Sequence, residues 1–177
     1  MNVGRASIIG LGNILKGDFG IGCYVLDALG QEPLGDAVEM VYLAENSSYI
    51  EAYMQGTDFS AIVQALSLGG APGNIHCWDV ARFQQNRAWL SETTPIVTRI
   101  AQALSRREFL EGSCGDILFL WIEPATTEGF GVSPEVQTAM RKAIRIVKQN
   151  LFARGFLAEK AYQLSYIHQL AMLDIKV

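Results

Sequence analysis

The sequence contains few of the residues from which disulfide frameworks, zinc modules and membrane spans are built. Its 177 residues include 3 cysteines and 2 histidines, and the cysteines are widely spaced without a CxxC pair. Scattered cysteines in odd number are typical of buried thiols in a reducing compartment. No apolar run reaches the roughly eighteen residues of a membrane span, and the glycine-broken N-terminal segment is unlike a signal peptide. We therefore expect a cytoplasmic protein with no membrane partner.

An excess of positive charge is also missing. The chain carries 14 lysines and arginines against 18 aspartates and glutamates, which gives a formal net charge of −4. Such a mildly acidic surface offers no electrostatic reason to bind nucleic acid, whose phosphates attract basic proteins. The hydrophobic fraction is 50% and the charged fraction 18%, values that are ordinary for a globular domain with a sizeable core.

Short apolar runs recur along the chain and predict the strands of a sheet. They cover residues 5–12, 37–44, 59–67 and 115–124, and the near-continuous run at 59–67 indicates burial on both faces, as in a parallel sheet. Residues 74–80 alternate in polarity after a short turn, which favours an antiparallel strand at or near the sheet edge. The pattern predicts a three-layer α/β fold with a twisted, mostly parallel sheet of about five strands and helices on both faces.

Helical spacing of apolar residues and helix-start signals fill the intervals between these strands. Ser133 followed by Pro134 begins the longest predicted helix, and Thr93 or Thr94 followed by Pro95 begins another. We expect one α/β domain over residues 1–155 and a C-terminal helical extension of the same domain over residues 156–177. The predicted helices cover residues 20–30, 47–56, 94–109 and 133–155.

The glycine-rich segment IIGLGNILKGDFGIG, residues 8–22, follows the first predicted strand and admits several interpretations. It begins GxG, as nucleotide-binding loops do, but Leu15 stands where the third glycine of GxGxxG belongs. No Walker loop fits either, because Lys16 is followed by a glycine and by no hydroxyl residue. Peptidyl-tRNA hydrolases share the GLGN start but need a histidine shortly after it, and the first histidine here is His76. A small-molecule or nucleotide-binding α/β protein stays open as an alternative.

The longer pattern GxGNxLxGDxGxG resembles that of the hydrogenase maturation proteases, which trim the C-terminal tail from the large subunit of nickel-iron hydrogenases. Two further segments resemble this family in the same order, APGNIHCWDV at residues 71–80 and FLWIEPATTEGFGVSPEVQTAM at residues 119–140. The resemblance implies the phosphorylase/hydrolase-like α/β fold of these proteases. It also implies that the glycine-rich loop shapes a substrate cleft, through Gly10, Gly12, Asn13, Gly17, Asp18 and Gly20.

The same resemblance implies a metal site without a serine or cysteine nucleophile. The family places an acidic residue after the GD of the loop, an aspartate at the end of the third strand and a histidine near the start of the next helix. In this sequence those positions fall on Phe19, Gln64 and, within a residue, Thr93. Carboxylates and imidazole suit nickel, whereas a phenyl ring cannot ligate and a neutral amide or hydroxyl ligates poorly.

Two nearby carboxylates are possible substitute ligands. Asp18 flanks the first ligand position and Glu92 adjoins the third. For Asp18, however, we expect the role of capping the following helix or of accepting N–H groups of the loop. The sequence therefore predicts no catalytic residue and no cofactor, with nickel or another divalent metal bound only if these carboxylates rebuild the site.

The sequence as a whole predicts a protein of nickel-iron hydrogenase maturation with a degenerate metal site. Its role would be that of a non-catalytic accessory that binds a hydrogenase large subunit or an assembly intermediate. An active metal-dependent endopeptidase with displaced ligands is the second interpretation, and the small-molecule or nucleotide binder is the third.

Overall fold

The computed structural model describes residues 4–158, except for the side chains of residues 47 and 93. The helical extension expected over residues 156–177 lies largely outside the described residues. No helix within residues 4–158 is long and apolar enough to cross a membrane. The elements in chain order are β1 (Ala6–Leu11), η1 (Gly17–Gly20), α1 (Ile21–Gly30), β2 (Val38–Ala44), η2 (Ser47–Tyr49), α2 (Ile50–Met54), β3 (Phe59–Ala65), β4 (Ile75–Trp78), α3 (Val80–Thr93), α4 (Pro95–Glu111), β5 (Asp116–Ile122) and α5 (Pro134–Ala153).

The strands form a five-stranded sheet in the order β2-β1-β3-β5-β4. The pairs β1–β2, β1–β3 and β3–β5 are parallel, and β4 runs antiparallel to β5 at the sheet edge. The predicted fold class is thereby confirmed, including the single antiparallel strand. The partner of that strand is β5, which follows it in the chain, and not the strand that precedes it.

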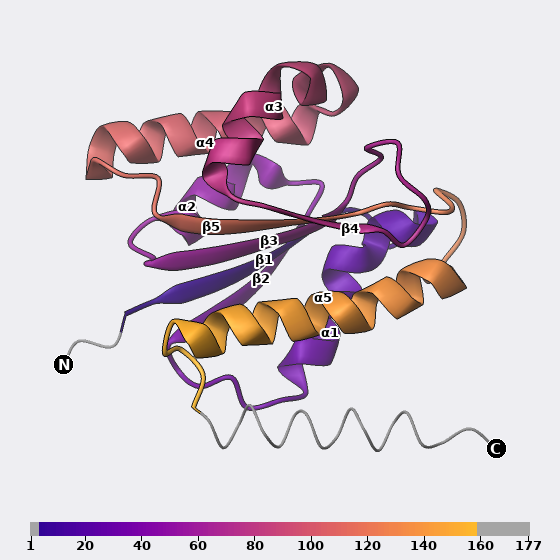
Figure 1. Ribbon diagram of the computed structural model, residues 1–177, viewed down its shortest axis with the longest axis horizontal. Coiled ribbons are helices and arrows are strands. Elements are labelled where there is room, and N and C mark those ends of the chain that lie inside the picture. The colour runs from indigo at the N-terminus through magenta and orange to yellow at the C-terminus, as the bar shows by residue number, and fades with distance from the viewer. Residues whose placement is uncertain (1–3, 159–177) are drawn as a thin grey trace.

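The helices cover the two faces of the sheet in separate layers. Helices α1 and α5 lie on one face, and α2, α3 and α4 lie on the other (Figure 1). Because successive side chains of a strand point to opposite faces, each buried strand contributes core side chains to both faces of the sheet. In β3, Ala61 and Val63 pack toward α1 and α5, whereas Ile62 packs toward α2 and α4. Gln64 shares the strand face of Ile62 by the same alternation.

The start signals placed the two long helices correctly. Ser133 caps α5 by accepting a hydrogen bond from Val136 N at 3.4 Å, and Pro134 and Pro95 occupy the first positions of α5 and α4. The single helix expected over residues 47–56 is wrong in extent. The chain instead forms the short turn η2 and then the five-residue α2.

Helix α3 was not predicted at all. Its N-cap is Asp79, whose Oδ1 accepts a hydrogen bond from Arg82 N at 2.8 Å. Most of its residues face solvent, and only a few side chains, Phe83 and Leu90 among them, reach the core beside the sheet. A helix with so narrow an apolar face leaves little periodicity to recognise in the sequence.

Candidate functional site

A cavity of about 680 Å³ lies where the carboxyl ends of the parallel strands meet. This is the edge of an open α/β sheet at which ligands bind, and the volume falls within the roughly 300–1,000 Å³ of small-molecule sites. Segments far apart in the chain line it: the loop after β1, the end of β2, the end of β3, the start of α4 and the loop after β5. The lining residues are Gly12, Asn13, Lys16, Phe19, Ala44, Glu45, Gln64, Thr94, Pro95, Ile96, Arg99, Thr127 and Glu128.

The glycines of the loop are required by close contact within the protein itself. Gly12 has φ 121°, and a Cβ there would lie 1.7 Å from the carbonyl oxygen of Phe19. A Cβ on Gly10 would lie 2.5 Å from the carbonyl oxygen of Gly22, so this pair lets α1 lie directly against β1. The glycines thus allow the loop to pack closely against its own backbone around the turn η1. Because these contacts within the protein already account for the glycines, they do not support the nucleotide-binding alternative.

Asp18 ties this loop to the loop that follows β5. Its side chain is fully buried and accepts hydrogen bonds from the backbone N–H groups of Ala125 (2.8 Å), Thr126 (2.9 Å) and Ser133 (2.6 Å). The hydroxyl of Ser133 donates a fourth, at 2.9 Å. We expected Asp18 to cap the following helix or to accept N–H groups of its own loop, but its hydrogen-bond donors belong to the segment after β5. Asp18 does not line the cavity.

The structure brings together the positions at which the sequence resemblance places metal ligands. Phe19 is half-buried and Gln64 is 4% exposed, and both line the cavity. Thr94, adjacent to Thr93, lines it as well. Glu92 lies exposed near the end of α3 and is not a lining residue. Within residues 4–158 no group of three or more histidine, cysteine, aspartate or glutamate side chains is arranged to hold a metal ion.

Gln64 has an unsatisfied polar group. Its Oε1 is buried and has no hydrogen-bond partner among the described residues. An unpaired buried amide costs about 1–3 kcal/mol. The indole Nε1 of Trp121, which lies opposite Gln64 on β5, is likewise buried without a hydrogen-bond partner among the described residues. The sequence singled out Gln64, but it could not show that the side-chain oxygen lacks a hydrogen-bond partner. A strand pattern does not reveal which residues of other elements lie nearby.

An ion pair between Lys16 and Glu45 lines the cavity. Glu45 follows β2 and accepts hydrogen bonds from Lys16 Nζ at 2.8 Å and Asn13 Nδ2 at 3.3 Å. The Lys16 ammonium, and secondly the Asn13 amide, hold the pKa of the Glu45 carboxyl below its usual range. Ala44, just before it, has φ 51°, a left-handed conformation that is uncommon outside glycine and is found at functional sites.

The N-terminus of α4 also lines the cavity. Thr94 precedes the helix with an extended backbone, and its side chain makes no capping hydrogen bond. Arg99 lies about one turn further along and donates to Ser48 Oγ at 3.1 Å. The positive end of the helix dipole and a guanidinium therefore face the same space. Sequence reasoning missed Arg99, which was identifiable only as a basic residue in the first turns of the predicted helix.

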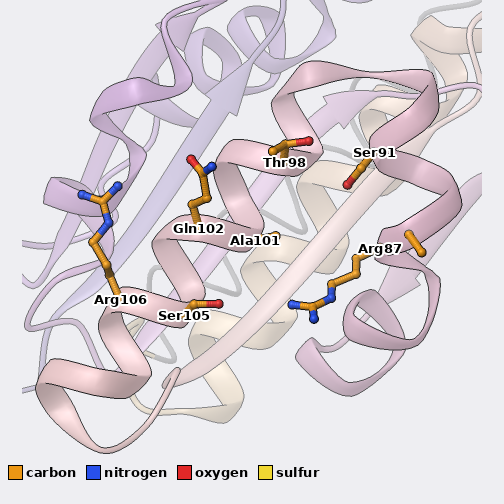
Figure 2. Close-up of a pocket in the computed structure, with 8 residues that line it drawn as sticks. Arg87, Ser91, Thr98, Ala101, Gln102, Ser105 and Arg106 are labelled. Atoms are coloured by element: carbon orange, nitrogen blue, oxygen red, sulfur yellow. The ribbon is translucent and has the colours of Figure 1, made fainter.

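A second hollow of about 610 Å³ lies between α3 and α4 (Figure 2). Small and polar side chains such as Ser91 and Ser105 line it together with Arg87 and Arg106. Arg106 pairs with Glu51 at 3.1 Å. This groove contains none of the positions that the sequence singled out, and its lining residues come from two helices of one layer.

No known family model matches the sequence, and no curated protein is significantly similar to it. Solved structures match the fold. The hydrogenase maturating endopeptidase HybD of Escherichia coli has a TM-score of 0.78 at 24% identity, over 85% of this chain and 94% of that chain. The NiFe hydrogenase maturation protease HybD of Thermococcus kodakarensis gives 0.66 at 19% identity, over 82% of this chain and 97% of that chain. The chain therefore has the fold of the hydrogenase maturation endopeptidases.

Proposed function

We propose that this protein acts in the maturation of nickel-iron hydrogenases by binding a hydrogenase large subunit, or an assembly intermediate of it, without cleaving it. The fold shared with maturation endopeptidases and the glycine-rich loop motif support the pathway. The observation that carries the non-cleaving role is the composition of the cavity, in which Phe19 and Gln64 occupy the positions expected to ligate metal.

The residues around the cavity do not suit a catalytic metal ion. Phe19 has no lone pair to donate, and the neutral amide of Gln64 is a poor ligand for nickel. The carboxylate of Asp18 is occupied by four donors, and that of Glu45 is engaged by Lys16. We therefore derive no hydrolytic step through a metal.

The surroundings of the cavity suit a large partner. Asp18 holds together the two loops that border it, so the site is formed before a ligand arrives. Leu15 and Phe130, on those two loops, are 59% and 84% exposed. Large exposed apolar side chains beside a cavity are typical of surfaces that contact another protein.

Complex formation with a purified large subunit that retains its C-terminal tail tests this proposal. Size-exclusion chromatography with light scattering should show a complex of the two chains. Phe19→Ala, which removes an apolar wall of the cavity, should weaken binding by about 2 kcal/mol, the scale of an interface hot spot. Phe109→Ala is the matched control, since Phe109 is 87% exposed in the last turn of α4. Absence of any complex would contradict the proposal, and a shortened large subunit would favour the endopeptidase alternative.

A further inference from the structure

We propose that the exposed face of α5 docks an acidic segment of a partner protein. The side chains of Arg141, Lys142 and Arg145 bind its carboxylates, and Phe152 contacts an apolar side chain next to them. None of these residues lines the cavity, so this surface is separate from the site on which the proposed function rests.

Helix α5 has one face in the core and one in solvent. Its buried side chains pack in the layer that it shares with α1, and Figure 1 shows it crossing the molecule beside the sheet, in orange and yellow. Arg141, Lys142 and Arg145 are exposed. Because residues four apart share a helix face, the two arginines lie one above the other, with Lys142 beside them. Phe152 follows Arg145 by about two turns on the same face and is 39% exposed.

The three cations of this stripe have no partner within the described part of the chain. Over residues 4–158 their side chains make no hydrogen bond, ion pair or ring contact, and Arg87 on α3 is the one other basic residue of which this is true. The neighbouring cations of the same helix are engaged. Lys148 pairs with Glu32, and Arg154 pairs with Asp116. The stripe is therefore an exception in a chain whose basic side chains are otherwise used by the fold.

The stripe does not stabilise the helix that carries it. Arg141 lies four residues before Arg145, and Lys142 lies three residues before it. Like charges at these spacings repel each other and destabilise a helix. The cations also lie in the middle of α5, where the negative end of the helix dipole does not reach them. A charge cluster that opposes the fold and has no internal partner points to an external one.

The geometry of the stripe suits carboxylates. A guanidinium binds a carboxylate through two parallel hydrogen bonds, so each arginine can hold one acidic side chain. Arg141 and Arg145 are separated by about 6 Å along the helix axis. Alternate residues of an extended peptide are about 6.6 Å apart, so two acidic residues in alternation match the two arginines. Phe152 lies about 10 Å beyond Arg145, where it would meet an apolar side chain that follows the acidic pair.

Other anionic partners fit this surface less well. Three cations are fewer than the roughly four to eight basic residues of segments that bind anionic membranes. Nucleic acid is disfavoured because the chain as a whole carries a formal net charge of −4, which opposes binding to a polyanion. An acidic protein segment has local charge that matches the stripe without a large repulsion from the rest of the domain.

The test uses the 15N-labelled full chain titrated with acetyl-Glu-Gly-Glu-Gly-Leu-amide. The matched probe is the same peptide with glutamine in place of each glutamate. The glutamate peptide should shift the backbone amide signals of Arg141, Lys142 and Arg145 saturably. It should bind at least about tenfold more tightly than the glutamine peptide, which corresponds to about 1.4 kcal/mol. Its binding should also weaken when salt is raised from about 0.05 M to about 0.5 M, because salt screens exposed charges.

Two triple variants separate the stripe from the overall charge of the protein. The combination Arg141→Gln, Lys142→Gln and Arg145→Gln should weaken the glutamate peptide at least about tenfold. The matched control removes the same net charge from α3 and α4 on the opposite face of the sheet, through Arg82→Gln, Arg87→Gln and Arg106→Gln. It should change the affinity by no more than about twofold, because charges beyond a Debye length are screened.

The apolar contact has its own test. Replacing the leucine of the peptide by glycine should weaken binding to the unmodified chain but not to Phe152→Ala. The cost of the stripe to the fold is tested by urea-induced unfolding. The urea midpoint of the triple variant of the stripe should be unchanged or higher, because like-charge repulsion is relieved. A lower midpoint would mean that these cations serve the fold, and it would overturn the inference.

The contrary binding results are equally specific. Equal binding of the glutamate and glutamine peptides, no saturable shift, or equal weakening by the two triple variants would each overturn the inference. So would tighter binding of a thymidine trinucleotide, which carries the same negative charge as the glutamate peptide. Sedimentation with phosphatidylserine vesicles that only the triple variant of the stripe loses would assign the surface to a membrane instead. These measurements do not involve a hydrogenase subunit, so this inference and the proposed function fail separately.

Discussion

Replacing Asp18 by asparagine tests whether this buried carboxylate holds the two loops of the cavity together. Asp18 accepts four hydrogen bonds, from the N–H groups of Ala125, Thr126 and Ser133 and from the Ser133 hydroxyl. A carboxamide has the same shape but keeps only one oxygen. Its NH2 group replaces the other oxygen and cannot accept a hydrogen bond from the N–H group that it faces. With the oxygen kept at the Oδ2 position, the charge-assisted bond from Ser133 N to Oδ1 is lost, at about 1.5–3 kcal/mol, and the other three bonds lose their charge assistance. We therefore expect the free energy of unfolding to fall by at least about 2 kcal/mol.

Urea-induced unfolding, followed by circular dichroism, measures this change. Glu92→Gln is the control, because Glu92 is an exposed carboxylate on α3, and it should change the free energy of unfolding by less than about 0.5 kcal/mol. A loss below about 1 kcal/mol in Asp18→Asn would refute the reasoning, since it would mean that the four bonds are replaced without cost. Tight nickel binding abolished by the same substitution would instead assign Asp18 to a metal site.

Two further predictions concern charge and metal. Lys16→Met should raise the pKa of Glu45 toward its ordinary value, measured by NMR titration of the carboxyl carbon, because the Lys16 hydrogen bond is the main cause of the lowered pKa. Because the folded-state pKa of Glu45 is lowered, the Glu45–Lys16 pair stabilises the fold above the unfolded-state pKa. This contribution is lost as the pH falls through the folded-state pKa. A Glu45 pKa that the substitution leaves unchanged would contradict the assignment of Lys16 as its main cause. The combined variant Phe19→Glu, Gln64→Asp and Thr94→His should bind nickel in a calorimetric titration more tightly than the unmodified chain does. Equal nickel binding by both chains would contradict the proposal of a degenerate site.

The sheet and its loop motif were predictable because local residues specify them. Continuous apolar runs predicted four of the strands, and the Ser133–Pro134 start predicted α5. Helix α3 escaped prediction, since its few core side chains, Phe83 and Leu90 among them, give no recurrent apolar face. The pairing of β4 with β5 escaped it too, because strand order depends on packing between distant segments.

The sequence pointed to two residues that line the cavity, but it did not reveal their environment. The resemblance identified Phe19 and Gln64, and the structure places both at one cavity. The partners of Asp18 lie 107 to 115 residues away in the chain, so no local pattern reveals them. The left-handed backbone of Ala44 and the place of Arg99 at the cavity likewise depend on packing between segments that are distant in the chain.

The proposed function requires that the protein bind a hydrogenase large subunit without cleaving it. Intact-mass spectrometry of a tailed, nickel-loaded hydrogenase large subunit, after prolonged incubation with an equimolar amount of this protein, tests that claim directly. We predict an unchanged mass for the large subunit, both alone and recovered from the complex. A large subunit shortened at its C-terminus, with the released tail detected alongside it, would contradict the non-cleaving role.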